Sequence, residues 1–202
     1  MNSNNEMLAL DTERRRLGPD DPYELISIGL YSSTRGPLVC HPVRPLYDCP
    51  AKWEKQLGLA AGVLMSAPTY NSTCSSMRAH TMWRDVLVWN KAHEIEVMPY
   101  LSEIAESGRP LHNLQDVMRR CAPLLRDWNS YFGDYQFPSL ADAADELGLS
   151  FSVGGHHTAN SDAQMLIQIW NLLEANPFHL AALKEKRPEL LLVDHNEDAM
   201  PF

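Results

Sequence analysis

Two short segments at opposite ends of the chain carry residues suited to hydrolytic chemistry. The first, LALDTE, contains Asp11 and Glu13, and the second, HHTANSDA, contains His157 and Asp162. Three carboxylates and an imidazole are the groups needed to hold two divalent metal ions and to activate water against a phosphodiester. Either segment alone is weak support, because a chain with 26 acidic residues contains Asp-x-Glu by chance. Together they make a two-metal site the working hypothesis.

The spacing of Asp11 and Glu13 suits the end of a strand. Side chains two residues apart in a strand point to the same face, and α/β sheets usually place ligands at the carboxyl ends of their strands. Neighbouring carboxylates repel each other unless a cation lies between them, and hard oxygen ligands favour Mg²⁺ or Mn²⁺. A solvated strand end remains the alternative for this segment.

Asp162 and His157 fall at the start of a predicted helix. Asp162 lies on the apolar stripe of that helix, where an unpaired anion is costly to bury and a metal ion would remove the cost. A purely structural role stays open, because the helix dipole also favours Asp in the first turn. His157 precedes the helix and could act as a general base over the same cleft, although a lone His is more often an ordinary surface residue.

The apolar pattern predicts a mixed α/β sheet that positions these residues. Met7–Leu10 is a continuous apolar run typical of a central strand, and Glu24–Tyr31 alternates before a turn leads into Leu38–Cys40, which predicts an antiparallel hairpin. Another buried strand is expected at Asp85–Trp89. Flanking α-helices are expected over residues 92–108, 114–125, 139–148 and 159–175.

Length and composition favour one intracellular domain. The 202 residues, 45% of them hydrophobic, can bury one sizeable core. No apolar run of 18 residues exists and the N-terminus lacks the pattern of a signal peptide, so we expect no membrane span and a cytoplasmic location. The net charge of −9 argues against a protein that coats nucleic acid with a basic face, although part of the excess could be metal ligands.

The four cysteines follow no CxxC spacing, which indicates reduced, unpaired thiols. They are Cys40, Cys49, Cys74 and Cys121. A zinc-stabilised interaction domain that uses Cys40, His41, Cys49 and Cys74 is a weaker alternative, because structural zinc sites usually draw their ligands from two tight pairs.

These motifs resemble those of the DnaQ-like 3′–5′ exonucleases of the DEDDh group, which have the ribonuclease H-like fold. The family's opening Asp-Thr-Glu matches residues 11–13, and its closing His-x-Ala-x-x-Asp-Ala matches residues 157–163. Its middle motif, an Asn four residues before an Asp, is similar to Asn90 followed by Glu94. Glu therefore replaces the expected Asp, and its shared helical face with apolar residues predicts that Glu94 points inward.

The resemblance implies an exonuclease domain over residues 1–176, followed by a C-terminal helix and acidic tail over residues 177–202. Such a domain would release nucleoside 5′-monophosphates from a single-stranded or frayed 3′ end of DNA or RNA. It would hold two ions of Mg²⁺ or Mn²⁺ through Asp11, Glu13, Glu94 and Asp162. His157 would be the general base, and the implied substrate-binding residues are Thr12, Leu17, Asn90 and His93.

The chain departs from the family pattern at several positions. Arg14, Arg15 and Arg16 stand where small residues are usual, and they either grip a phosphate or form an exposed charged turn. His93 either stacks on a terminal base or has a packing role. Asn113 takes the place of the Asp expected at the start of the following helix.

The end of the chain suggests a partner of its own. Residues 178–192 predict a helix, and the last six residues, EDAMPF, loosely resemble short peptides that dock on a sliding clamp, with Glu197 in place of the usual Gln. A frayed terminus is the alternative. The competing hypothesis for the whole chain is an exonuclease-fold binding module that holds nucleic-acid 3′ ends or a protein partner with little turnover. Glu94 and the acidic composition favour it.

Overall fold

The computed structural model describes residues 6–16, 23–45, 51–56, 58–126, 128–131, 133–151 and 158–175. β2 runs antiparallel to its neighbours β1 and β3, whereas β1, β4 and β5 are parallel. The predicted α/β class, a mixed sheet with one antiparallel hairpin, is confirmed. Within these residues the sheet has the order β3 (Gly36–Pro42), β2 (Tyr23–Ser32), β1 (Leu8–Arg16), β4 (Asp85–Val88) and β5 (Asn113–Asp116).

The central strand is β1, because its first residues are apolar on both faces of the sheet. Leu8–Leu10 are fully buried, and alternate side chains enter two different cores. The apolar run predicts a strand only as far as Leu10, but β1 continues to Arg16. The three arginines at its end therefore belong to the strand, and the alternative of an exposed charged turn is wrong.

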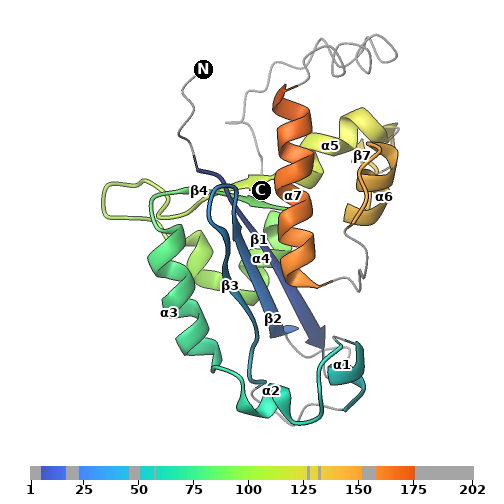
Figure 1. The fold of residues 1–202 in the computed structure, drawn as a ribbon. Coiled ribbons are helices and arrows are strands. Elements are labelled where there is room, and N and C mark those ends of the chain that lie inside the picture. The colour runs from blue at the N-terminus through green and yellow to red at the C-terminus, as the bar shows by residue number, and fades with distance from the viewer. Residues whose placement is uncertain are drawn as a thin grey trace.

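Each face of the sheet is covered by its own set of helices (Figure 1). One core forms against α3 (Tyr70–Thr81), α4 (Lys91–Val97) and the short 3₁₀ helix η1 (Pro99–Ser102). The other forms against α5 (Val117–Leu125), α6 (Leu140–Glu146) and α7 (Ala159–Ala175). The remaining short elements are α1 (Ala51–Gln56), α2 (Val63–Ser66), β6 (Trp128–Asn129) and β7 (Asp134–Tyr135).

The last two helices follow the sequence signals closely. The Ser139 hydroxyl accepts a hydrogen bond of 3.1 Å from the Asp142 N–H and so caps α6. Gly148, which takes a left-handed conformation with φ of +71°, follows the end of that helix. α7 begins at Ala159 and buries its apolar stripe against the sheet, as its periodicity predicts.

Two expected helices are shorter than their apolar patterns. α4 ends at Val97 because Pro99 cannot continue its hydrogen bonding, so the helix expected over residues 92–108 is short, and Ile104 within that range is 65% exposed. The helix expected from Leu114 begins only at Val117. The residues before it form β5, where pairing with β4 overrides the helical pattern.

No helix among the described residues is long and apolar enough to cross a membrane. Residues 176–202 lie outside the described part of the chain. The predicted C-terminal helix, the clamp-docking segment and the division of the chain at residue 176 therefore stay predictions.

Candidate functional site

The middle of β1 presents Asp11 and Glu13 on one face of the sheet. Asp11 pairs in register with Gly29 of β2, and Glu13 pairs with Ser27. The face that carries them also carries Ala9, which packs in the core below α7. The two carboxylates therefore follow this buried residue along the same face, in the direction of the carboxyl end of β1.

The first turn of α7 lies directly on this face because β2 has a glycine there. A Cβ atom added to Gly29 would fall 2.2 Å from the backbone oxygen of Ala159, which no real side chain tolerates. Reciprocal hydrogen bonds cap the helix start: the Ser161 N–H donates to the Thr158 hydroxyl over 3.2 Å, and the Thr158 N–H donates to the Ser161 hydroxyl over 3.0 Å. The close approach of the α7 backbone to Gly29 thus determines the position of Asp162, which lies in the same first turn of that helix.

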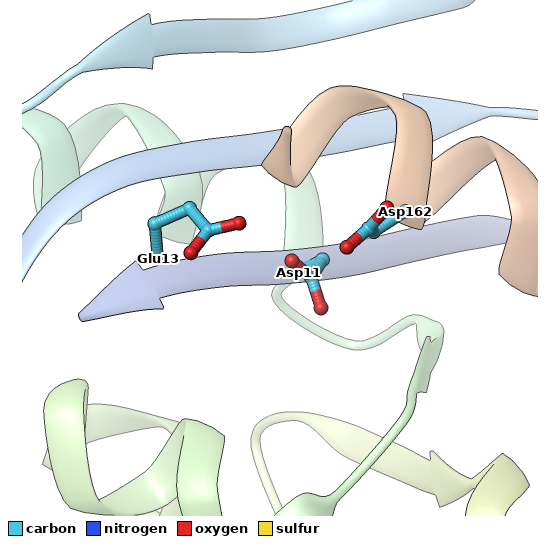
Figure 2. Close-up of side chains that lie close together, drawn as sticks. All are labelled: Asp11, Glu13 and Asp162. Atoms are coloured by element: carbon cyan, nitrogen blue, oxygen red, sulfur yellow. The ribbon is translucent and has the colours of Figure 1, made fainter. Parts of the chain in front are cut away.

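Asp11, Glu13 and Asp162 converge in space. Each offers a carboxylate oxygen, and the three oxygens lie within 4.8 Å of one another. Figure 2 shows Asp11 and Glu13 projecting from β1 and Asp162 reaching towards them from α7. The two sequence segments with which the prediction began are therefore brought to one place at the middle of the central strand, just beyond its last pairing with β4.

Glu94 lies near these three carboxylates but does not belong to the group whose oxygens are within 4.8 Å of one another. It is only 4% exposed, on the inward side of α4, and its Oε2 accepts a hydrogen bond of 2.9 Å from the Thr12 hydroxyl. The Asn90 side chain accepts from the His93 N–H over 3.3 Å and caps α4, which sets the turn that carries Glu94. The predicted inward orientation of Glu94 is thus observed, and Thr12 and Asn90 hold it.

Asp116 connects the start of α4 to the start of α5. Its Oδ2 accepts from the Lys91 N–H over 3.1 Å, and its Oδ1 accepts from the Arg119 N–H over 3.0 Å. This residue ends β5 and caps the following helix, whereas Asn113 begins β5. The expectation that Asn113 replaces the Asp at the start of that helix is therefore wrong, because Asp116 occupies the position.

The crowding of carboxylates shifts their protonation equilibria. Burial, and then the charges of Glu94, Asp162 and Glu13, raise the pKa of Asp11 well above its usual value. Burial raises the pKa of Glu94 from 4.5 to about 8, against the opposing effects of the Thr12 hydrogen bond and of Arg14. A nearby positive charge, such as a bound cation, would favour the ionised forms of these carboxyl groups and lower their pKa values again.

The chain is similar to known proteins in fold and not in sequence. No protein-family model and no curated protein sequence matches the chain. Among solved structures, the ExoI/SSB-Ct complex superposes with a TM-score of 0.57 at 15% identity, covering 94% of this chain and 46% of that one. Exonuclease I from Methylocaldum szegediense gives 0.57 at 14% identity, covering 93% and 42%. The chain spans less than half the length of both.

A third similar structure is of comparable length. The nuclease domain of 3′hExo, a DEDDh family member bound to rAMP, superposes with a TM-score of 0.55 at 15% identity, covering 87% of this chain and 94% of that one. The chain has the DnaQ-like exonuclease fold. In this ribonuclease H-like architecture, the carboxylate cluster lies at the middle of the first, central strand, just beyond its pairing with β4.

The donor set of this DnaQ-like fold fits a hard divalent cation. Asp11, Glu13 and Asp162 supply only oxygen donors, which suit Mg²⁺ or Mn²⁺ better than softer metals. A bound cation would also offset the repulsion that raises the pKa of Asp11. Within the described residues no group containing Cys or His is arranged to hold a metal ion; Cys40, Cys74 and Cys121 are free thiols, and Cys49 lies outside.

The three arginines that end β1 have different surroundings. Arg15 is 2% exposed, and its Nη2 donates to Glu24 over 2.8 Å, so it serves the fold. Arg14 forms an ion pair of 2.7 Å with Glu96 of α4. Arg16 is exposed, and its guanidinium contacts the ring of a tyrosine on β2. A common role for all three, as a phosphate grip, is therefore wrong, since Arg15 is occupied.

The other predicted residues have different outcomes. His93 lies on the first turn of α4 with much of its surface exposed; partial desolvation of its ring, and then the nearby charge of Arg14, lower its pKa. Leu17 and His157 lie outside the described residues, so their roles stay predictions. Sequence reasoning missed Gly29 and Asp116. A glycine within an alternating apolar strand signals close backbone approach, and that signal was available at Gly29.

Gly29→Ala, on the neighbouring strand β2, should displace Asp162 and so disturb the carboxylate site. The new methyl group meets the backbone of α7, so the helix start must shift, at a cost of about 1–3 kcal/mol. We expect a lower melting temperature and weaker binding of Mn²⁺, measured by calorimetry. Ser27→Ala, on the same strand and face, is the matched control and should retain both. Equal metal affinity in Gly29→Ala and wild type would contradict this positioning role.

Metal and pH should act together on stability. Asp11 and Glu94 have raised pKa values in the fold, so their neutral forms stabilise it below about pH 4 and that contribution is lost as pH rises towards 8. In EDTA, we expect the melting temperature to fall between pH 5 and 8.5. Because a cation binds the ionised groups, Mg²⁺ or Mn²⁺ should raise the melting temperature more at pH 8.5 than at pH 5.

Glu94→Gln is the control for this pH dependence, because it keeps the shape of the side chain and removes its titration. Its melting temperature in EDTA should fall less with pH than that of the wild type. A metal-induced shift that is absent, or equal at both pH values, would argue against a cation site at these carboxylates.

Proposed function

We propose that this chain is a metal-dependent 3′–5′ exonuclease that releases nucleoside 5′-monophosphates from DNA or RNA. The observation that carries the proposal is the convergence of Asp11, Glu13 and Asp162 on the central strand of a DnaQ-like exonuclease fold. The similarity to the 3′hExo nuclease domain over nearly its whole length supports a function that resides in this one domain.

The carboxylates would hold two ions of Mg²⁺ or Mn²⁺. Ions held there supply an activated water and stabilise the charge that develops on the leaving 3′ oxygen. Asp11 and Glu13 would bind them from β1, and Asp162 would bind them from α7. Glu94 completes the set from α4, with one carboxylate oxygen retained by the Thr12 hydroxyl.

The remaining predicted residues would position the strand end and move the proton. Thr12 directly precedes Glu13, and Leu17 follows it by four residues. Asn90 caps the helix that carries Glu94, and His93 lies in its first turn. All four are proposed to contact the terminal nucleotide. His157 precedes the helix of Asp162 by two residues and is proposed to take the proton from the attacking water.

End-labelled oligomers test the function directly. With Mn²⁺, a 5′-labelled strand should shorten in steps of one nucleotide, whereas a 3′-labelled strand should release its label at once as a mononucleotide. Parallel DNA and RNA strands report sugar preference. Asp162→Asn should abolish cleavage with its circular dichroism unchanged, because it removes a ligand and relieves repulsion among the carboxylates.

EDTA is the control for metal dependence. Cleavage that persists in EDTA or in Asp162→Asn would contradict the proposal, as would release of label from the 5′ end first.

His157→Ala tests the general base separately. Loss of base catalysis should lower the rate constant of cleavage by about 10²-fold while metal affinity is retained. The pH–rate profile of the variant should lose its acidic limb. A rate within a few-fold of wild type would remove His157 from the mechanism.

A second candidate function is supported by the position of Glu94. Since this residue is hydrogen bonded to Thr12 and lies outside the group of three, the domain could bind nucleic-acid 3′ ends or a protein partner with little turnover. In that case labelled oligomers would bind but stay intact with Mn²⁺, and the metal-induced rise in melting temperature would be small.

A further inference from the structure

Cys40 of β3 is hydrogen bonded to the first turn of α7, the helix that carries Asp162. Its Sγ donates to Oδ1 of Asn160 over 2.9 Å, although the two residues are 120 positions apart in the sequence. Partial desolvation raises the pKa of the Cys40 thiol above its ordinary value, so the group keeps its proton at neutral pH and remains a donor. The contact therefore joins β3 to the start of the helix that supplies the third carboxylate.

Cys40 lies in one row with the carboxylate site across three neighbouring strands. It pairs in register with Gly29 of β2, and Gly29 pairs in register with Asp11 of β1. Residues that pair directly across strands have side chains on the same face of a sheet. Cys40 and Asp11 therefore share the face that α7 covers, two strand spacings or roughly 10 Å apart.

The first turn of α7 lies across this row and meets a different strand at each of three residues (Figure 2). From β3 to β1, the pairs are Cys40 with Asn160, Gly29 with Ala159, and Asp11 with Asp162. The third pair is repulsive when both groups are ionised, because the charge of Asp162 raises the pKa of Asp11. The first two contacts help to hold the turn against this repulsion.

We infer that Cys40 is a positioning residue, which through Asn160 holds the first turn of α7 where Asp162 can share a cation with the carboxylates of β1. The helix transmits the contact, because the Asp162 N–H donates to the backbone oxygen of Thr158 over 2.9 Å and so closes the turn that contains Asn160. Groups that orient a metal ligand without binding the metal contribute to its affinity. The inference rests on the proposed function, because it concerns the metal ions proposed for this site.

Mn²⁺ binding by a double-mutant cycle tests the hydrogen bond. Calorimetry should show an affinity for Mn²⁺ about three- to fivefold lower in Cys40→Ala, in the lower part of the range for one hydrogen bond because a thiol is a weak donor. Asn160→Ala should show a similar loss. The double variant should lose little more than either single variant, since both substitutions remove the same contact.

Two further variants are the controls for this cycle. Cys40→Ser keeps a donor at the position and should bind Mn²⁺ as the wild type does. Cys74→Ala removes a thiol from α3, which packs on the other core, and should also keep wild-type affinity. Because Cys40 is exposed, its substitution leaves no cavity in either core.

The metal dependence of cleavage separates positioning from a general loss of activity. In Cys40→Ala, the Mn²⁺ concentration that gives half the maximal rate should rise about three- to fivefold, as the affinity falls. The rate at saturating Mn²⁺ should match that of the wild type. A lower maximal rate with an unchanged half-saturating concentration would overturn the positioning role.

Amide hydrogen exchange in EDTA tests the contact without metal. In Cys40→Ala, exchange should become faster at Ser161 and Asp162, in the first turn of α7. It should stay unchanged at Ile167 and Ile169, in later turns that are anchored in the core. Equal exchange at the first turn in the variant and the wild type would contradict the inference.

The binding measurements also distinguish this inference from the function on which it rests. Wild-type protein that binds no Mn²⁺ contradicts both the proposed function and the positioning role. Wild-type binding with equal affinity in Cys40→Ala, or losses that add fully in the double variant, contradicts the positioning role alone.

Discussion

The contact between the first turn of α7 and Gly29 is the constraint on which the carboxylate cluster depends. Strand β1 alone places two acidic side chains on one face, as many strands do. The third arrives only because α7 can lie against the backbone of β2 opposite Asp11, where any side chain would hold the helix away. The apolar stripe of α7 then anchors the remaining turns in the core. A missing side chain on a neighbouring strand therefore determines the position of Asp162.

Collecting acidic groups in one place costs folding free energy, and the surrounding contacts show how the chain limits that cost. Asp11 and Glu94 both resist ionisation because desolvation raises the pKa of each carboxyl group, and the charge of Glu94 adds to the effect on Asp11. The Thr12 hydroxyl and the charge of Arg14 act in the opposite direction on Glu94. Asp116 accepts hydrogen bonds from backbone N–H groups in the first turns of α4 and α5, and so holds the backbone of α4, the helix that carries Glu94. The site is thus arranged to tolerate negative charge that only a cation would fully stabilise.

How far the sequence predicts this molecule depends on whether local pattern or tertiary pairing decides each element. The buried run before Asp11, the hairpin, and the Ser139 cap are local signals, and the structure confirms them. β5 could not be predicted, because its four residues show no strand pattern in the sequence and form a strand only by pairing with β4. The same reason explains the misassigned Asp: without β5, the start of α5 could not be located. The motifs predict that Asp11, Glu13 and Asp162 share one site. The role of Gly29 could not be predicted in the same way, because it depends on contact with the backbone of Ala159, which lies far along the chain.

The replacement of Asp by Glu at position 94 has a physical consequence that bears on both candidate functions. The side chain is one methylene longer, and in this structure its Oε2 reaches Thr12, whose neighbours in β1 are Asp11 and Glu13. A carboxylate has two oxygens. The hydrogen bond with Thr12 uses Oε2 of Glu94, so Oε1 can still bind a metal ion. The hydroxyl donor favours the ionised form, whereas burial favours the neutral one, and the pKa of about 8 marks that balance. A cation beside Asp11 would shift the balance towards the anion and draw Glu94 into the site. The longer side chain therefore makes the fourth ligand conditional on metal rather than absent, and turnover would depend on how strongly the first three carboxylates bind the ion.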